Sequence, residues 1–303
     1  MKDSKRILTI LDTDIGCDID DTWALAMLLR SPELDTVMVA TAAHNTVYRA
    51  KICAKLLERA GRHDIPVAVG IPGTPVPRDE RQLNWVKEYD LKNYPGTVYE
   101  DGVSAVIRTV EQADGPVTIV AIGPMTNLGA ITERAPHLTG KINLVAMIGS
   151  IEKQLDGKPG RIAEYNVVQD IPAAQKVFNA GWRSMTITPL DSCGIVRLNG
   201  ELYDRLVKSA DPLVKDLLEN YNIWSDAGGF GPAPDHSSIL FDTVAVHLAR
   251  TTEFLQMRQM RLRVDDQGFM LNDERGQEIN VAIEWKDLEG YKQFLVDRLL
   301  GLR

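Results

Sequence analysis

The sequence predicts an α/β fold in which a mostly parallel central sheet is flanked by helices. Short apolar runs, typical of strands buried on both faces, occur at residues 7–11, 37–42, 67–71, 117–122, 144–148 and 185–190. Between them lie amphipathic segments with helical spacing, at residues 21–29, 47–60, 103–112, 126–134 and 173–180. Strands that alternate with helices are joined by right-handed crossovers, which build a parallel, Rossmann-like sheet.

The last third of the chain has a different pattern. Helices are predicted at residues 200–208, 213–224 and 243–249, followed by a hairpin between residues 257 and 270 and a final helix near 288–300. We interpret this region as a helical C-terminal elaboration of the same domain, so that residues 1–303 form a single domain. Loops with Pro and Gly at residues 71–77, 156–160 and 228–234 are expected at the carboxyl edge of the sheet, where open α/β folds bind ligands.

Composition excludes several classes of partner. The net charge is −8 with the acidic residues scattered, so no basic face is available for a nucleic acid. No run reaches the roughly 18 apolar residues of a membrane span, and the apolar run after the basic start is too short for a signal peptide. The cysteines, Cys17, Cys53 and Cys193, are odd in number and widely spaced, which favours free thiols. We therefore expect a cytoplasmic protein with a small-molecule partner.

The segment at residues 12–21 is dense in aspartate. A strand that ends at Asp12 and Asp14, a turn at Gly16 and a helix that opens with Asp20 and Asp21 would gather these carboxylates at one strand end. Negative charges this close raise one another's pKa and destabilise the folded protein. A bound Mg²⁺ or Ca²⁺ offsets this destabilisation. In the simpler alternative, Asp20 or Asp21 only caps the helix and Asp18 is solvated.

An Asp-x-Asp motif after a first strand also occurs in phosphatases whose first carboxylate attacks phosphorus. This is a second enzyme hypothesis for the same segment. It fits less well, because the additional carboxylates would repel a dianionic phosphate.

Further short blocks follow the aspartate segment along the chain. They are Asn45 after the second predicted strand, Gly-Pro-Met-Thr-Asn at 123–127, Ala-Glu-Tyr-Asn at 163–166 with Asp170 beyond it, Pro-Leu-Asp at 189–191 and Phe241-Asp242. In type and order these blocks resemble the inosine-uridine preferring nucleoside hydrolase family, from the first strand to about residue 250. The resemblance implies a nucleoside hydrolase-like fold and a glycosidase that acts on ribonucleosides.

The resemblance also implies a division of roles. Asp14 and Asp21 would bind Ca²⁺ together with the main-chain carbonyl of Thr126 and the carboxylate of Asp242, an oxygen-only set of the kind calcium prefers. Asp14 would be the general base that takes a proton from a water acidified by the cation. Substrate contacts are implied for Asp20, Asn45, Met147, Glu164, Asn166 and Asp242.

The implied reaction is hydrolysis of the N-glycosidic bond of a ribonucleoside, or of a related N-riboside, to free base and ribose. Positive charge develops on the ribose ring in such a reaction, and a pocket rich in carboxylates and amides stabilises it. The resemblance implies a role in purine or pyrimidine salvage and a homodimer or homotetramer. A non-enzymatic alternative is a related fold that binds metal and ribosides without hydrolysis.

That alternative arises because Phe241 stands where characterised members have a histidine that protonates the departing base. We consider three replacements for this acid. His236, on a Gly- and Pro-rich loop, is the first candidate, and His44 is the second. Stacking of the base on Trp85, Trp224 or Phe230 is the third.

The aspartate segment departs from the family pattern as well, with two extra residues between Gly16 and the Asp-Asp pair. Asp18 could therefore replace Asp20 as the ribose ligand. Each implied role also has a structural alternative. Asn45 and Asn166 could be turn residues, Glu164 a solvated acid, and Thr126 and Asp242 helix N-caps.

Overall fold

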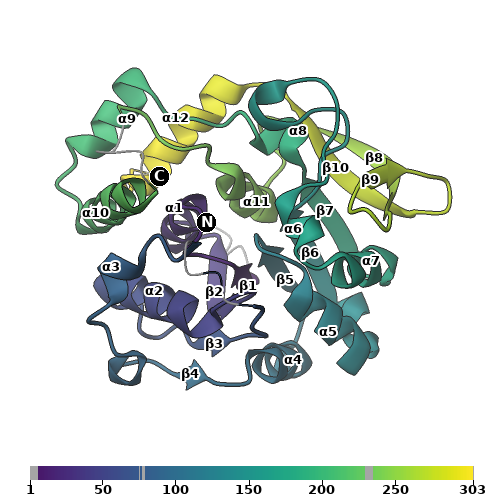
Figure 1. The fold of residues 1–303 in the computed structure, drawn as a ribbon, viewed down its shortest axis with the longest axis horizontal. Helices are drawn as coiled ribbons and strands as arrows, with labels where there is room; N and C mark the ends of the chain where they lie inside the picture. The colour runs from purple at the N-terminus through teal and green to yellow at the C-terminus, as the bar shows by residue number, and fades with distance from the viewer. Residues whose placement is uncertain (1–5, 75, 77–78, 229–234, 303) are drawn as a thin grey trace.

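The computed structural model describes residues 6–74, 76, 79–228 and 235–302. Within these residues ten strands form one sheet in the order β4-β3-β2-β1-β5-β6-β7-β10-β8-β9 (Figure 1). The strands from β4 to β10 in this order pair in parallel, and β8 and β9 pair antiparallel. The predicted α/β class with a mostly parallel sheet is confirmed.

The strands predicted in the first two thirds of the chain are all present. The sheet consists of β1 (Ile7–Thr13), β2 (Leu34–Thr41), β3 (Val67–Val69), β4 (Val98–Tyr99), β5 (Val117–Ala121), β6 (Ile142–Met147), β7 (Ser184–Thr188), β8 (Leu255–Val264), β9 (Met270–Asn272) and β10 (Gln277–Trp285). Strand β4 was not predicted, because two residues are too short for a recognisable period.

The α-helices are α1 (Asp20–Leu29), α2 (Thr46–Arg59), α3 (Leu83–Val86), α4 (Gly102–Gln112), α5 (Thr126–Arg134), α6 (Tyr165–Val168), α7 (Ile171–Asn179), α8 (Leu190–Cys193), α9 (Gly200–Val207), α10 (Pro212–Ala227), α11 (Phe241–Arg250) and α12 (Leu288–Leu299). Short 3₁₀ turns lie at Leu91–Asn93, Pro136–Lys141 and Leu155–Gly157. Among the helices described, none has both the length and the apolar character needed to span a bilayer.

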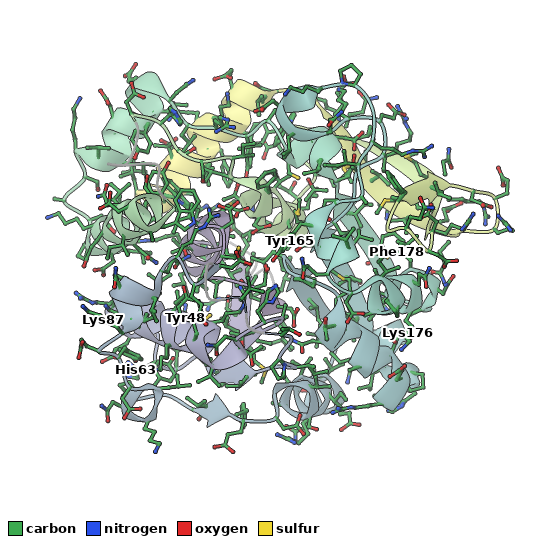
Figure 2. The ribbon with its side chains drawn as sticks, in the orientation of Figure 1. Tyr48, His63, Lys87, Tyr165, Lys176 and Phe178 are labelled. Atoms are coloured by element: carbon green, nitrogen blue, oxygen red, sulfur yellow. The ribbon has the colours of Figure 1, made fainter. Side chains whose placement is uncertain are left out.

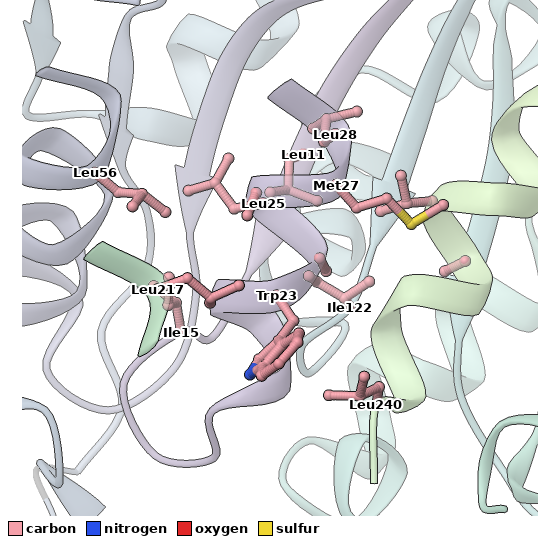
Figure 3. Packing of buried hydrophobic residues seen from close by; sticks show 14 of the residues in the cluster. Leu11, Ile15, Trp23, Leu25, Met27, Leu28, Leu56, Ile122, Leu217 and Leu240 are labelled. Atoms are coloured by element: carbon pink, nitrogen blue, oxygen red, sulfur yellow. The ribbon is translucent and has the colours of Figure 1, made fainter. Parts of the chain in front are cut away.

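Two hydrophobic cores cover the two faces of the sheet. Alternate strand residues point to opposite faces, so Leu11 of β1 belongs to one core and Ile10 to the other. The first core is closed by α1, α2, α10, α11 and α12, and Figure 3 shows Leu25, Leu56 and Leu217 of three of these helices converging in it. The second core is closed by α4, α5 and α7. Both faces are covered, as the apolar strand runs indicated.

The C-terminal region has the predicted helices, as α9, α10, α11 and α12, and one strand more than was predicted. The predicted hairpin at residues 257–270 is the antiparallel β8–β9 pair, but β8 also pairs with β10. Strand β10 in turn pairs in parallel with β7, so these three strands extend the main sheet. Strand β10 was not predicted, and it joins the predicted hairpin to the main sheet. Pairing between β7 and β10 depends on residues far apart in sequence, which local periodicity does not encode.

The strand order reverses direction at β1, which lies between β2 and β5. Crossovers on the two sides of this point leave the sheet in opposite directions and open a crevice at the carboxyl ends of the strands. Asp14 directly follows β1 and Ile122 directly follows β5, so both residues face this crevice from its floor.

Candidate active site

A cavity of about 270 Å³ lies at the carboxyl ends of β1, β5 and β6, close to the lower limit of about 300 Å³ for small-molecule sites. It is lined by Asp14, Cys17, Asp18, Asp20, Asp21, Ile122, Met147, Leu155, Ile162, Glu164, Tyr165, Asn166, Leu190, Phe241 and Asp242. The lining combines acidic side chains with apolar ones. Tyr165, labelled near the middle of Figure 2, lies at the start of α6.

Three carboxylates form the centre of the acidic side. One oxygen from each of Asp20, Asp21 and Asp242 lies within 4.8 Å of the others, and all three side chains are buried. The main-chain N–H of Asp242 donates to Asp20 Oδ2 at 3.3 Å, and the Thr13 hydroxyl donates to Asp21 Oδ1. Asp20 and Asp21 begin α1 and Asp242 lies in the first turn of α11, so two helix N-termini bring their positive ends to the cluster.

The cluster is electrostatically costly when it is ionised. Burial raises the pKa of Asp20, Asp21 and Asp242 well above its usual range, and the negative charges of neighbouring aspartates raise it further. Burial also raises the pKa of Asp14, which lines the same cavity. A divalent cation with oxygen ligands would remove this cost, so the residues present fit such an ion.

Arg49 of α2 lies beside this cluster, and no sequence motif indicated that position. Arg49 Nη1 lies 3.9 Å from Asp14 Oδ2, and the two side chains are only 2% and 8% exposed. Its guanidinium also donates to the carbonyls of Ala43 and Ile15, each at 3.0 Å. The positive charge of Arg49 lowers the pKa of Asp14 and opposes the effect of burial.

The turn between Asp14 and Asp20 is held by its main-chain carbonyls. Four consecutive carbonyls each accept a hydrogen bond from a different side chain: Ile15 from Arg49 at 3.0 Å, Gly16 from Tyr48 at 3.0 Å, Cys17 from Trp224 at 2.8 Å and Asp18 from Gln82 at 3.2 Å. Gly16 has φ +124°, and a Cβ there would lie 2.6 Å from the Tyr48 ring. This turn is thus bonded to α2, α10 and the loop before α3.

The opposite wall of the cavity is built around Glu164 and Asn166. Glu164 caps α6, and its carboxylate accepts from the N–H groups of Gly149 at 2.9 Å and Asn166 at 2.8 Å. Burial raises its pKa to about 7. The Asn166 amide donates to the carbonyls of Met147 at 3.1 Å and Ile122 at 3.3 Å, so these contacts fix both polar side chains at the cavity wall.

Residues 9–293 match the model of the inosine-uridine preferring nucleoside hydrolases, and this match decides the family of the chain. The chain belongs to this family. It is 27% identical to the pyrimidine-specific ribonucleoside hydrolase RihA of Citrobacter koseri, over 96% of this chain and 97% of that protein. It is likewise 27% identical to the probable uridine nucleosidase 1 of Oryza sativa subsp. japonica, over 95% and 90%.

Solved nucleoside hydrolase structures share the fold. A plant nucleoside hydrolase superposes with a TM-score of 0.80 at 24% identity, covering 97% of this chain and 99% of that one. An inosine-uridine preferring nucleoside hydrolase from Bacillus anthracis gives 0.78 at 18% identity, covering 98% and 100%. The match to the family favours a glycosidase over the phosphatase hypothesis, since it extends over nearly the whole chain.

This nucleoside hydrolase brings most of the residues assigned by resemblance to one cavity. Asp14, Asp20, Asp21, Met147, Glu164, Asn166 and Asp242 all line it, and so does Asp18. Asp18 and Asp20 differ in exposure, because Asp20 is buried and Asp18 is exposed and bonded to the neighbouring Ile19 N–H. Both residues line the cavity, so the choice of Asp20 as the ribose contact is part of the proposed function.

Asn45 and Thr126 do not line the cavity. Asn45 caps α2 by accepting from the Tyr48 N–H at 3.1 Å, and its amide donates to Glu80 at 2.7 Å. Thr126 begins α5, and its hydroxyl donates to Asp170 at 2.8 Å. Asn45 is therefore a helix N-cap and not the turn residue of its structural alternative, whereas the N-cap alternative for Thr126 is wrong, because Met125 is the N-cap residue of α5.

The first candidate for the leaving-group acid is also away from the cavity. The His236 ring contacts the Ser237 carbonyl through Nδ1 at 2.8 Å, and His236 is not a lining residue. Trp85 is buried against Lys55, and the indole N–H of Trp224 is bonded to Cys17. Phe230 lies outside the described residues. His44 is different, because its Nε2 lies 3.3 Å from the hydroxyl of Tyr165, a lining residue.

Two further acids of the family blocks have structural contacts. Asp12 accepts from the Asn127 amide at 2.7 Å, and burial raises its pKa to about 7. Asp191 accepts from three successive main-chain N–H groups, those of Ile151, Glu152 and Lys153, at 2.7–2.9 Å. Neither residue lines the cavity.

Proposed function

We propose that this chain hydrolyses the N-glycosidic bond of ribonucleosides, with Asp14 as general base and a Ca²⁺ ion held by Asp14, Asp21 and Asp242. The observation that carries the proposal is the convergence of buried carboxylate oxygens within 4.8 Å beside Asp14, in the cavity of a nucleoside hydrolase. The ion would lower the pKa of a water molecule and offer ligand positions to ribose hydroxyls. The Thr126 carbonyl remains in the proposed ligand set by family resemblance.

The donor set supports a hard cation. Every side-chain ligand is a carboxylate oxygen, and soft donors are absent from the three-acid group found among the described residues. Oxygen-only coordination suits Ca²⁺ and Mg²⁺ better than transition metals. We prefer Ca²⁺ because of the family resemblance.

The chain's own residues would divide the chemistry. Asp14 accepts the proton of the attacking water, and the nearby Arg49 charge favours its ionised form. Asp20, Glu164, Asn166 and Asp242 hold ribose hydroxyls, and their oxygens stabilise the positive charge that develops on the sugar. The apolar side chains of Met147, Ile122 and Leu190 exclude bulk water from the reacting carbon.

The test is a panel of purine and pyrimidine ribonucleosides incubated with the protein after exhaustive chelation and again after Ca²⁺ or Mg²⁺ is added. Release of base only with added metal supports the proposal, and the preferred ion distinguishes Ca²⁺ from Mg²⁺. Tight riboside binding without any free base would instead identify a binding protein. Hydrolysis of p-nitrophenyl phosphate, with nucleosides left intact, would favour the phosphatase hypothesis.

We also propose that the protein acts in nucleoside salvage in the cytoplasm, as one domain and as a homodimer or homotetramer. The unpaired thiols of Cys17, Cys53 and Cys193 suit a reducing compartment, and the continuous sheet from β1 to β10 suits one domain. Names of relatives suggest uridine and other pyrimidine nucleosides as the first substrates to test. Light scattering measures the oligomeric state, and a monomer would contradict that part of the proposal.

A further inference from the structure

A nucleoside hydrolase with Phe241 in place of the family histidine needs another way to stabilise the departing base. The Phe241 ring lines the cavity but has no exchangeable proton. Most groups in the lining that do have one are those of Asp14, Asp20, Asp21, Glu164, Asn166 and Asp242, to which the proposed function gives other tasks, and the exceptions besides Tyr165 are Cys17 and Asp18. The phenol of Tyr165, at the start of α6, has no such task.

The Tyr165 hydroxyl is connected to a histidine by a defined geometry. Its oxygen lies 3.3 Å from His44 Nε2, and His44 Nδ1 lies 2.7 Å from the carbonyl oxygen of Thr74. A carbonyl only accepts, so Nδ1 must carry a hydrogen. In the neutral ring Nε2 is then an acceptor for the Tyr165 hydroxyl, and in the imidazolium it is a donor to the Tyr165 oxygen.

The backbone that presents His44 is strained and firmly held. Ala43 and His44 have φ values of +62° and +48°, in a region that residues other than glycine seldom adopt. The Ala43 carbonyl accepts from Arg49 at 3.0 Å, and the His44 carbonyl accepts from the Gly73 N–H at 3.0 Å. Non-glycine residues persist in this conformation where the surrounding structure determines it, and such positions cluster at functional sites.

We propose that Tyr165 is the proton donor to the leaving base and that His44 is the positioning residue that resupplies its proton. This inference rests on the proposed function. As the C1′–N bond breaks, its electron pair goes to the base, the hydroxyl proton of Tyr165 goes to a nitrogen or oxygen of the base, and the His44 Nε2 proton goes to the Tyr165 oxygen. Water adds its hydroxyl to C1′ and gives its other proton to Asp14.

The surroundings of the pair agree with this sequence of transfers. Tyr165 is 39% exposed, but the partial burial of its phenol still raises its pKa, so the phenol keeps its proton and is a weak donor unless a second proton replaces the first. Among the described residues, Arg49, Asp79 and Glu80 line the same small cavity as His44, and the pKa of Asp14 responds to the His44 charge.

The test compares two substrates that differ in their need for an acid. A nucleoside requires protonation of its base, whereas p-nitrophenyl β-D-ribofuranoside has a leaving group that departs as an anion. We expect Tyr165→Phe to lower kcat on nucleosides about 100-fold or more and to change kcat on the nitrophenyl riboside by less than about threefold. His44→Asn, which tolerates a positive φ, should show the same selectivity, and the double variant should lose no more than either one.

Tyr99→Phe, on β4 and away from the cavity, is the matched control and should leave both activities unchanged. Equal losses on both substrates in Tyr165→Phe, or full nucleoside activity, would overturn the assignment of the proton donor while leaving hydrolysis intact. A wild-type protein that hydrolyses neither substrate would overturn the proposed function, and this inference with it.

Discussion

Arg49 lies 3.9 Å from Asp14, and both side chains are almost completely buried. The guanidinium lies behind a cluster of carboxylates and holds the carbonyls of Ile15 and Ala43 on either side of it. It therefore connects the turn that follows β1 with the strained segment that carries His44. The geometry makes Arg49 the principal protein countercharge to Asp14 in the described part of the chain.

Replacing Arg49 by methionine should be severely destabilising. Removing one partner of a buried charge pair typically costs about 3–5 kcal/mol, and two carbonyls also lose their donor. Urea unfolding measures the loss. Arg49→Lys keeps the charge but not the planar fork, so it should recover only part of the stability. Unchanged stability in Arg49→Met would show that the ion pair has no structural role.

The pH dependence of stability should be reversed from the usual pattern in the metal-free protein. Burial raises the pKa of Asp12 and Glu164 to about 7, from unfolded values near 4, and raises those of Asp20 and Asp242 as well. The folded state then binds more protons than the unfolded state, so the free energy of unfolding falls as pH rises from about 4 through 7. Each unit of raised pKa contributes about 1.4 kcal/mol. Urea unfolding at about pH 5 and pH 8 measures this, and greater stability at the higher pH would contradict it.

Metal binding should raise the stability of the protein most where the acids are ionised. An ion that binds only the folded state adds about 2.7 kcal/mol at a concentration 100 times its Kd. Thermal unfolding with and without Ca²⁺, at about pH 8, measures the gain. In Asp21→Asn the gain should be lost. An equal response of Tm in the variant and the wild type would place the ion elsewhere.

Gln82 should be a positioning residue for the aspartate turn. It is fully buried, donates to the Asp18 carbonyl at 3.2 Å, and accepts from Asn220 at 2.7 Å and Thr22 at 3.2 Å. Gln82→Ala leaves these buried groups unsatisfied and should cost about 1–3 kcal/mol. We also expect a lower kcat, because Asp18 and Asp20 lose their support. The exposed Gln256→Ala is the control, and equal effects of the two substitutions would contradict this role.

Much of the fold was predictable because the strands from β1 to β7, except β4, contain apolar runs and alternate with amphipathic helices. The acids Asp14, Asp20 and Asp21 lie in one short segment, so their proximity followed from a strand, a turn and a helix. Contacts made over long sequence separations were not predictable. Trp224 bonds to a carbonyl 207 residues away, and β10 pairs with β7 across the helical region.

Sequence patterns did not indicate the roles of Arg49 and Tyr165, for a different reason. Arg49 occupies an ordinary position of an amphipathic helix, and only the packing of α2 against the turn at Ile15 shows that its charge is buried. Tyr165 stood within a block recognised for its neighbours Glu164 and Asn166. Its pairing with His44 depends on a positive φ at a residue other than glycine, which no sequence pattern indicated.

The most direct test of the account is the release of base from a ribonucleoside by Ca²⁺-loaded wild-type protein and by Asp14→Asn, measured by chromatography. Asp14 is the proposed general base, and asparagine preserves its shape without its basicity. The account predicts stoichiometric base and ribose from the wild type and a rate at least about 100-fold lower from the variant, with the fold intact by circular dichroism. Equal rates from the two proteins would contradict it.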